Sequence, residues 1–238
     1  MEKKRIEIID ALRGLALILM VIHHFLYDLV VLCGAPWWLF TNPVFDVLHY
    51  IFAGTFILLS GVSSRFSHSN LSRGIKCFII AMLMTLVTSL PIIDSPIRFG
   101  VLHLLGSCMV FFGLTQKVWD LIPRKLAPVL YVALLVGSDL LIKYVSIGGS
   151  AAHYLFPFGW TYPGFTSSDW FPIFPWLFVF LLGTWAGIYI KERRLPEWFY
   201  RFTCPVLPQV GRHSLLIYVL HQPVLYGLVY AAKFIFKF

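Results

Sequence analysis

The sequence predicts an all-α fold, a polytopic membrane helical bundle with about seven transmembrane helices and a cytoplasmic N-terminus. First, 59% of the 238 residues are hydrophobic and only 13% are charged, whereas soluble domains are about 45–50% apolar and ~25% charged. Second, apolar stretches of membrane-spanning length fill nearly the whole chain. Third, the basic residues gather at alternate ends of these stretches. A water-soluble globular fold is therefore excluded, and we expect one integral-membrane domain over residues 1–238.

A bilayer-crossing helix needs about 20 mostly apolar residues. Seven stretches meet this need, at residues 12–32, 44–63, 75–93, 100–116, 127–147, 172–190 and 213–235. The first stretch contains Asp, Arg and His, and no small-residue cleavage site follows it. We therefore expect it to remain in the mature protein rather than to be removed as a signal peptide.

The orientation follows from the basic residues, which concentrate on the cytoplasmic side of membrane proteins. With the N-terminus inside, that side receives fourteen of them, namely Lys3, Lys4, Arg5, Arg65, Arg73, Lys76, Lys117, Arg124, Lys125, Lys191, Arg193, Arg194, Arg201 and Arg212. The other side receives Arg98, Lys233 and Lys237. The net charge of +8 is thus explained by the orientation of the protein in the membrane. Because nucleic-acid binding is not needed to explain the charge, we expect no nucleic-acid partner. The four cysteines lack metal-type spacing, which argues against zinc, iron–sulfur and disulfide frameworks.

The longest outer loop, residues 148–171, has no Lys or Arg and is rich in aromatic residues. Such a loop suits a membrane-surface lid or a platform on which sugar rings stack. The aromatic belt of a membrane interface is the more ordinary interpretation of the same residues. Both interpretations stay open.

Ionisable residues within a membrane span cost roughly 2.5–3.5 kcal/mol each and tend to be functional. At about 100° per residue, Asp10, Arg13, His24 and Asp28 share one face of the first span, with His24 about 16 Å beyond Arg13. Asp28 is four residues after His24 and could orient its ring, as in general base catalysis. The alternative is a buried polar network that only ties helices together.

Other histidines fall at comparable depth: His49 and His103 near the outer starts of their spans, and His221 near the middle of the last one. Together with His23 and His24 they predict a polar cavity that opens outward. For any one of them alone, an interhelical hydrogen bond is the better explanation, so the prediction depends on their clustering.

The segment 60–76 combines small residues and hydroxyls with three cations, Arg65, Arg73 and Lys76. This composition suits phosphate binding through charge-assisted hydrogen bonds. A basic loop near anionic lipid has the same composition. Because there is no Walker or dinucleotide fingerprint, ATP-driven chemistry is not expected.

Five ordered segments carry a resemblance to a known family: residues 5–16 with His23-His24-Phe25, then 59–63, 99–106, 174–176 and 211–223. Together they resemble the bacterial type of the heparan-alpha-glucosaminide N-acetyltransferase catalytic-domain-like family. The spacing of Arg13 and His24 is also similar to a motif of the wider transmembrane acyltransferase superfamily.

The resemblance implies transfer of an acetyl or other acyl group from cytoplasmic acyl-CoA, the co-substrate, to a sugar hydroxyl or amine on the far side. We therefore expect three sets of site residues and no metal. The catalytic set is His24, Asp28 and His23; the acceptor or oxyanion set is His49, His103, His221 and Gln222; the set for CoA phosphates is Arg13, Arg65, Asn70, Arg73, Lys76 and Arg212.

The chain departs from the family at one place. In the lysosomal enzyme after which this family is named, the catalytic histidine lies in the loop after the first helix. The corresponding loop of this chain, residues 33–43, has no histidine. His24 is therefore supported by the superfamily motif and by its own setting.

Three rival hypotheses stay open: a proton-coupled small-molecule transporter, a haem or quinone protein and a non-catalytic partner subunit. We expect a multi-pass protein of the plasma (cytoplasmic) membrane whose partners are acyl-CoA, a sugar or glycan acceptor and the lipid bilayer. The sequence leaves a homo-oligomeric state open.

Overall fold

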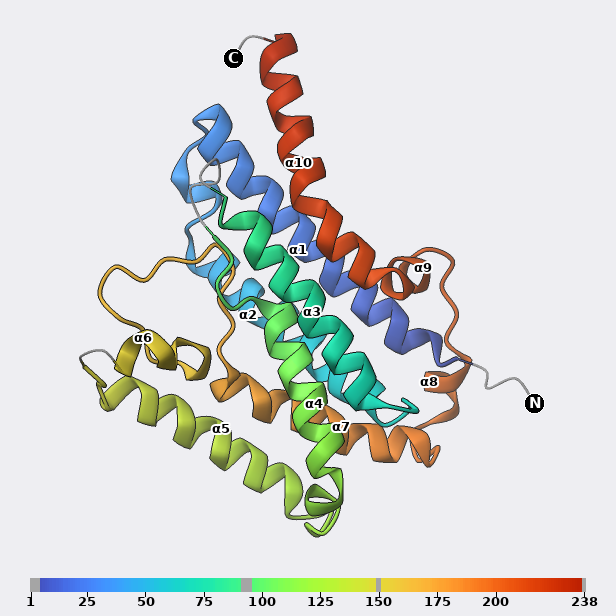
Figure 1. Ribbon diagram of the computed structural model, residues 1–238. Helices are drawn as coiled ribbons and strands as arrows, with labels where there is room; N and C mark the ends of the chain where they lie inside the picture. The colour runs from blue at the N-terminus through green and yellow to red at the C-terminus, as the bar shows by residue number, and fades with distance from the viewer. Residues whose placement is uncertain (1–4, 91–95, 149–150, 237–238) are drawn as a thin grey trace. The chain divides into compact units, whose positions relative to one another are not determined.

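The computed structural model describes residues 5–90, 96–148 and 151–236. Among these residues, seven helices are long and apolar enough to cross a membrane, which confirms the predicted all-α class and the seven spans. They are α1 (Glu7–Cys33), α2 (Pro43–Ser64), α3 (Asn70–Thr88), α4 (Val101–Trp119), α5 (Ala127–Tyr144), α7 (Ile173–Lys191) and α10 (Ser214–Phe236). Short helices connect them: η1 (Trp37–Leu39), α6 (Ala152–Leu155), η3 (Phe156–Phe158), α8 (Glu197–Arg201) and α9 (Leu207–Arg212). The chain is a multi-pass integral membrane protein (Figure 1).

The third span begins earlier than predicted, at Asn70 instead of residue 75. The reason is a capping residue that hydropathy does not register: Ser69 is extended, and its Oγ accepts a hydrogen bond from the Ser72 N–H at 3.2 Å. This bond satisfies one of the orphan amides at the helix start. The last three residues of the predicted span, 91–93, lie outside the described residues.

The chain divides into two compact units. The first comprises residues 1–56 and 195–238, and the second comprises residues 57–194, so the division falls within α2. The cytoplasmic N-terminus and the single domain remain predictions. Lys3, Lys4 and Lys237, which entered the orientation argument, lie outside the described residues.

In the first unit, α1 packs along α9 and α10 (Figure 1). Two glycines let α1 and α9 approach at backbone distance: a Cβ on Gly14 would clash with the Leu207 carbonyl, and one on Gly211 would clash with the Asp10 carbonyl. Close contact at small residues is the usual way in which helices associate in a membrane.

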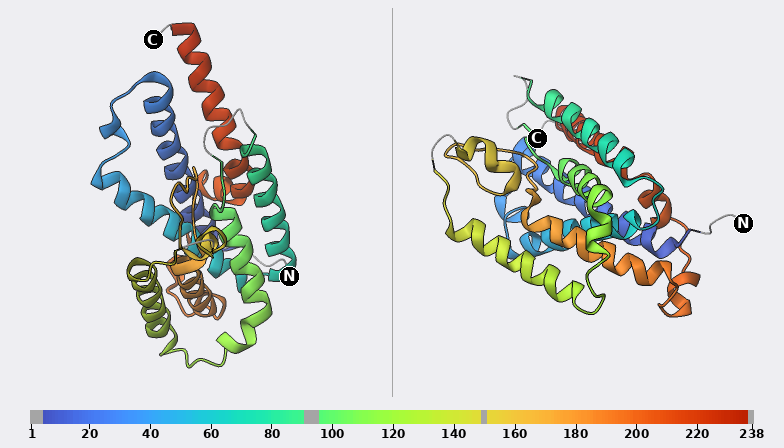
Figure 2. Two further views of the ribbon diagram at one scale, coloured as in Figure 1. Left: turned by 60° about the vertical axis from the view of Figure 1, so that its left-hand side comes forward. Right: turned by 60° about the horizontal axis from the view of Figure 1, so that its bottom comes forward.

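In the second unit, α3 packs on α4 and α5 packs on α7, as the two views of Figure 2 agree. Gly74 and Gly106 lie at the α3–α4 contact. The later half of α2 meets α7 just as closely, because a Cβ on Gly61 or on Gly183 would clash with a carbonyl of the other helix. Helix α4 supplies much of the core of this unit, including Leu104 and Phe112, both without exposed surface.

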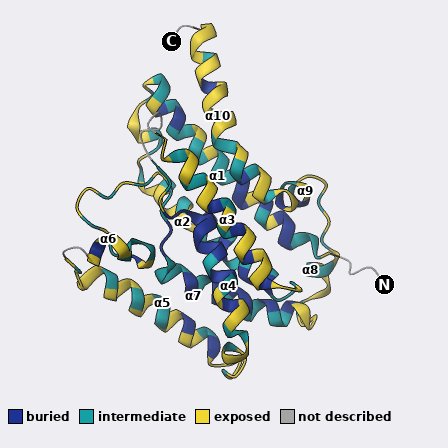
Figure 3. Cartoon of the chain, viewed as in Figure 1, coloured by how far each residue is buried: buried dark blue, intermediate teal, exposed yellow. Residues whose placement is uncertain are grey.

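Exposed residues cover much of α5 and the far part of α10 (Figure 3), and large apolar side chains such as Leu140, Leu228 and Phe234 are among them. Extensive exposed apolar surface of this kind marks contact with lipid.

Candidate active site

Four histidines meet in the first unit, and we call them the histidine cluster: His23 and His24 on α1, His49 on α2 and His221 on α10. The ring centroids of His23 and His49 are 5.0 Å apart, those of His24 and His221 are 4.9 Å apart, and those of His23 and His24 are 6.0 Å apart. The structure thus brings together residues separated by up to almost two hundred positions. In the described part of the chain, no group of three or more His, Cys, Asp or Glu side chains is placed to hold a metal ion.

A buried acid beside the cluster has an amide partner. Gln222 on α10 donates from Nε2 to Oδ1 of Asp28 on α1 at 2.8 Å, and Asp28 is only 2% exposed. Within the described ranges, Asp28 Oδ2, Gln222 Oε1 and His23 Nδ1 are buried and have no hydrogen-bond partner. Buried polar atoms are normally satisfied, so such atoms call for an explanation, and a bound ligand is one.

The pairing differs from the predicted one, in which Asp28 orients His24. Asp28 gives one carboxylate oxygen to Gln222, and its other oxygen has no partner among the described residues. The periodicity of one helix places Asp28 and His24 on the same face, but it cannot reveal a competing partner from a helix far along the chain.

His221 has a defined ring state. Its Nδ1 lies 2.7 Å from the Tyr218 carbonyl oxygen. A carbonyl only accepts, so Nδ1 carries the hydrogen, and a neutral ring then holds its lone pair on Nε2. Pro223 follows two residues later and has no N–H to donate to the Val219 carbonyl, which leaves that carbonyl without its usual helical donor.

Aromatic residues that the sequence did not single out line His23. The ring centroid of Phe40 lies 4.7 Å from that of His23, and Phe52 lies at 5.9 Å. Phe40 also packs on Tyr27 at 5.1 Å. No pattern in the loop 33–43 would have selected Phe40, because its position depends on how the loop folds back onto α1.

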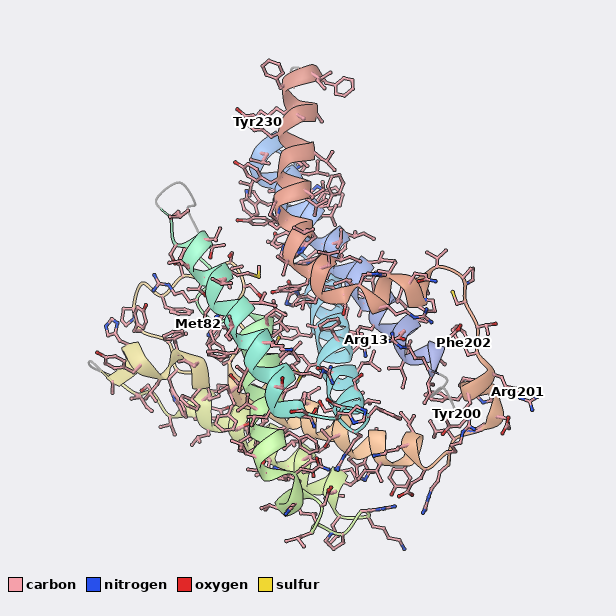
Figure 4. All side chains as sticks on the ribbon, turned by 45° about the vertical axis from the view of Figure 1, so that its right-hand side comes forward. Arg13, Met82, Tyr200, Arg201, Phe202 and Tyr230 are labelled. Atoms are coloured by element: carbon pink, nitrogen blue, oxygen red, sulfur yellow. The ribbon has the colours of Figure 1, made fainter. Side chains whose placement is uncertain are left out.

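An ion cluster occupies the other end of α1, at its contact with α9, where Figure 4 labels Arg13. Arg13 Nη1 lies 2.9 Å from Asp10 Oδ1. Arg212 is 3.7 Å from Asp10 Oδ2 through Nε and 3.9 Å from Glu7 Oε1 through Nη2. Two arginines thus face two carboxylates, and Arg13 is held more tightly than Arg212.

His103 belongs to the second unit and is 2% exposed. The Gly100 N–H donates to its Nδ1 at 3.2 Å, so Nε2 carries the hydrogen and faces Thr85 Oγ1 at 3.2 Å. Thr85 in turn donates to the Ile97 carbonyl at 2.7 Å. Both ring nitrogens therefore have protein partners, which is the arrangement of a histidine that fixes the start of a helix.

The proposed phosphate residues of the second unit have different settings. The Arg65 side chain is 8% exposed, with Nη1 2.7 Å from Asp120 Oδ1 and Nε donating to the Thr184 carbonyl at 3.0 Å. It joins α2, α4 and α7. Arg73 and Lys76, by contrast, are exposed on α3. Asn70 donates from Nδ2 to the Ser64 carbonyl at 3.0 Å, and its buried Oδ1 has no partner in the described part of the chain.

The described part of the aromatic loop, residues 151–171, is held against the start of α4. The His153 and Tyr162 rings stack at 4.0 Å, Arg98 Nη1 donates to the Tyr162 hydroxyl at 3.2 Å, and Asp169 Oδ2 accepts from the Val101 N–H at 3.1 Å. Residues 149 and 150 of this loop lie outside the described residues. The platform and the belt interpretations both remain predictions.

The fold and the site together define a class, a multi-pass helical membrane protein with a buried cluster of imidazole, carboxylate and amide groups. Within this class the family is clear. The sequence model of the family described as heparan-alpha-glucosaminide N-acetyltransferase, catalytic, matches residues 5–223, so the chain belongs to that family. Membership implies membrane acyltransferase activity. Neither the curated proteins nor the solved structures contained a match to the chain.

Proposed function

We propose that the protein transfers an acetyl or other acyl group from cytoplasmic acyl-CoA to a sugar hydroxyl or amine on the extracytoplasmic side of the membrane. The observation that carries the proposal is the hydrogen-bonded pair of Asp28 and Gln222 beside the histidine cluster. The oxygen that each side chain does not use in this pair, Asp28 Oδ2 and Gln222 Oε1, is buried and lacks a partner in the described residues. Family membership supports the acyl-transfer chemistry.

The acceptor binds at this cluster in our proposal. Because the Gln222 amide nitrogen points to Asp28, its carbonyl Oε1 is left for a ligand, and Asp28 Oδ2 is left in the same way. Both are acceptor atoms, so they complement a ligand that donates hydrogen bonds, such as a hydroxyl or amine. Gln222, His221 and His49 therefore position the acceptor rather than stabilise an oxyanion. His103, whose two nitrogens are occupied, takes a structural role.

In the chemical step, His24 removes the proton from the acceptor oxygen or nitrogen as that atom attacks the thioester carbonyl carbon. The tetrahedral intermediate then expels the CoA thiolate as the carbon–sulfur bond breaks, and the proton on His24 passes to the sulfur. Asp28 accepts from the acceptor through Oδ2 and holds Gln222 in place through Oδ1. A positioned base of this kind contributes about 10²–10⁴-fold to a rate.

CoA carries a diphosphate and a third phosphate, which suit exposed cations. We assign this contact to Arg73 and Lys76, with the unpartnered Asn70 Oδ1 accepting an N–H of the ligand. Arg212 belongs to the first unit and stays a separate prediction for phosphate binding; its ion-pair distances to Glu7 and Asp10 are long. Arg13 supports it by holding Asp10, and Arg65 keeps the end of α2 in place.

The first test measures binding of CoA and acetyl-CoA to the purified protein by calorimetry. Wild type should bind, and Arg73→Ala/Lys76→Ala should bind far more weakly. Lys143→Ala, which changes an exposed cation in the last turn of α5, is the matched control. A folded protein that binds neither ligand at millimolar concentration would contradict the acyl-CoA proposal and favour the transporter, which moves a substrate without consuming acyl-CoA.

The second test follows release of the CoA thiol with glucose or glucosamine offered as the acceptor. His24→Ala should abolish transfer and leave CoA binding nearly unchanged, whereas His213→Ala, a change at the exposed histidine that caps the end of α9, should leave the protein like wild type. A His24→Ala protein that retains most of its turnover removes His24 from the base role. Trapping of acylated protein in the absence of acceptor would indicate a relay through an acyl-histidine instead of direct transfer.

A further inference from the structure

A basic surface lies in the second unit, where the ends of α4 and α7 and the start of α5 come together. It is formed by residues 117–126, which run from the end of α4 to the start of α5, and residues 191–194 at the end of α7; we call it the basic rim. All three helices are candidate membrane spans, and these are their ends. The rim therefore lies at a membrane surface whichever way the protein is oriented.

Glu192 ties the two segments of the rim together. Its carboxylate accepts from Arg124 Nη1 at 2.9 Å and lies 2.8 Å from Arg124 Nη2, while Arg194 Nε lies 2.8 Å from Oε2. Trp185 Nε1 donates to the Arg124 carbonyl at 2.9 Å. The hydrogen bond from Arg124 holds the pKa of Glu192 below its usual range, so the carboxylate stays ionised and the arginines stay fixed.

The rim has a large excess of positive charge. It contains six cations, Lys117, Arg124, Lys125, Lys191, Arg193 and Arg194, against two acids. One of the acids, Asp120, pairs with Arg65 from α2. All six cations are exposed. The surface thus offers several cations to an anionic ligand.

Apolar side chains project between the cations. Leu121 is 82% exposed, and Val118 and Leu126 are 61% and 60% exposed. A soluble phosphate compound would make no contact with these apolar side chains. A lipid would contact them, because apolar residues enter the boundary of headgroup and acyl chain while Lys and Arg stay at the level of the phosphates.

Arg193 adds an independent observation. Its φ is 56°, in the left-handed region, and it directly follows the cap of α7. The Arg193 N–H donates to the Ile190 carbonyl at 3.1 Å and the Arg194 N–H to the Tyr189 carbonyl at 3.0 Å, which closes the helix. Glycine is the favoured residue in this conformation. A large cation held in a strained conformation is typical of a functional position.

From these observations we infer that the basic rim binds the phosphate headgroup of an anionic phospholipid, with Leu121 inserted at the acyl boundary. The lipid, rather than a soluble phosphate, is the expected ligand because the apolar residues lie among the cations. The proposal is independent of acyl transfer, since it uses none of the residues assigned to the acceptor or to acyl-CoA.

The test uses the full-length protein in detergent and measures the shift in its melting temperature on adding dioleoylphosphatidylglycerol or dioleoylphosphatidylcholine. A ligand that binds only the folded state raises the melting temperature in a concentration-dependent way. We expect a saturable rise with the phosphatidylglycerol that the phosphatidylcholine does not produce. Sodium phosphate at the same concentration should not reproduce it.

Two variants separate lipid binding from folding. Arg193→Gly should raise the melting temperature in phosphatidylcholine, because strain is relieved, and yet reduce the additional rise with phosphatidylglycerol. Lys125→Gln/Arg193→Gln should lose most of that rise, whereas Lys143→Gln at the opposite end of α5 should keep it. An equal response to both lipids, an equal response to phosphate, or a full response in the Lys125→Gln/Arg193→Gln variant would overturn the proposal.

Discussion

The surroundings of Asp28 indicate why the protein keeps a carboxylate that is energetically costly to bury. It is almost fully buried, it receives one hydrogen bond, from Gln222, and its second oxygen lacks a partner in the described residues. An unsatisfied buried charge destabilises a protein. Its presence is therefore better explained by a ligand than by packing.

The change Asp28→Asn tests this explanation. Asparagine can still accept from Gln222, but it removes the charge that faces the acceptor. We expect the transfer rate to fall about 10- to 100-fold, equivalent to the loss of one charge-assisted hydrogen bond of roughly 1.5–3 kcal/mol. The melting temperature should stay the same or rise. A variant with normal transfer would give Asp28 a purely structural role.

His103 and His221 look alike in the sequence but are predicted to respond differently. His103→Ala leaves the Gly100 N–H without its partner, so it should lower the free energy of unfolding by about 1–3 kcal/mol while the activity per folded molecule persists. His221→Ala should keep its stability and lose activity. Thermal unfolding and turnover, measured on the same samples, distinguish the two. Similar profiles for both variants would contradict the assignment.

At the scale of helices, close packing depends on particular glycines. A Cβ on Gly183 of α7 would clash with the Leu58 carbonyl of α2, whereas a Cβ on Gly137 of α5 would meet nothing within 4 Å. Gly183→Ala should therefore destabilise the protein by about 1–3 kcal/mol through overpacking. Gly137→Ala, the control, should be neutral or stabilising by up to ~1 kcal/mol. Equal melting temperatures would show that α2 and α7 do not pack as described.

The helices were predictable because a membrane span is a local property, namely about 20 apolar residues in a row. The residues at which the helices begin were harder to predict. Helix α3, for example, begins at Asn70, because a serine cap extends the helix beyond its apolar part. The sequence shows which polar side chains lie within the spans, but it does not show which of them pair. His24 and Asp28 stand out on one helix, but the Gln222 partner of Asp28 and the Thr85 partner of His103 appear only after distant segments have packed.

At the scale of the whole molecule, the orientation determines which ligands each end can meet. The positive-inside rule predicts that the α2–α3 loop is cytoplasmic and that the loop 148–171 is outside. The donor proposal depends on this, because acyl-CoA is a cytoplasmic compound and Arg73 follows the α2–α3 loop directly.

Cysteine labelling tests the orientation. Cys77 and Cys108 are buried, so only Cys33 and Cys204 need replacement by serine before a single cysteine is introduced at an exposed serine, Ser72 or Ser168. In right-side-out vesicles, a membrane-impermeant maleimide should label Ser168→Cys at once and Ser72→Cys only after the vesicles are opened. The reverse pattern would place Arg73 and Lys76 outside, away from acyl-CoA. The donor assignment would then fail even if the protein were an acyltransferase, whereas the lipid proposal for the basic rim would stand.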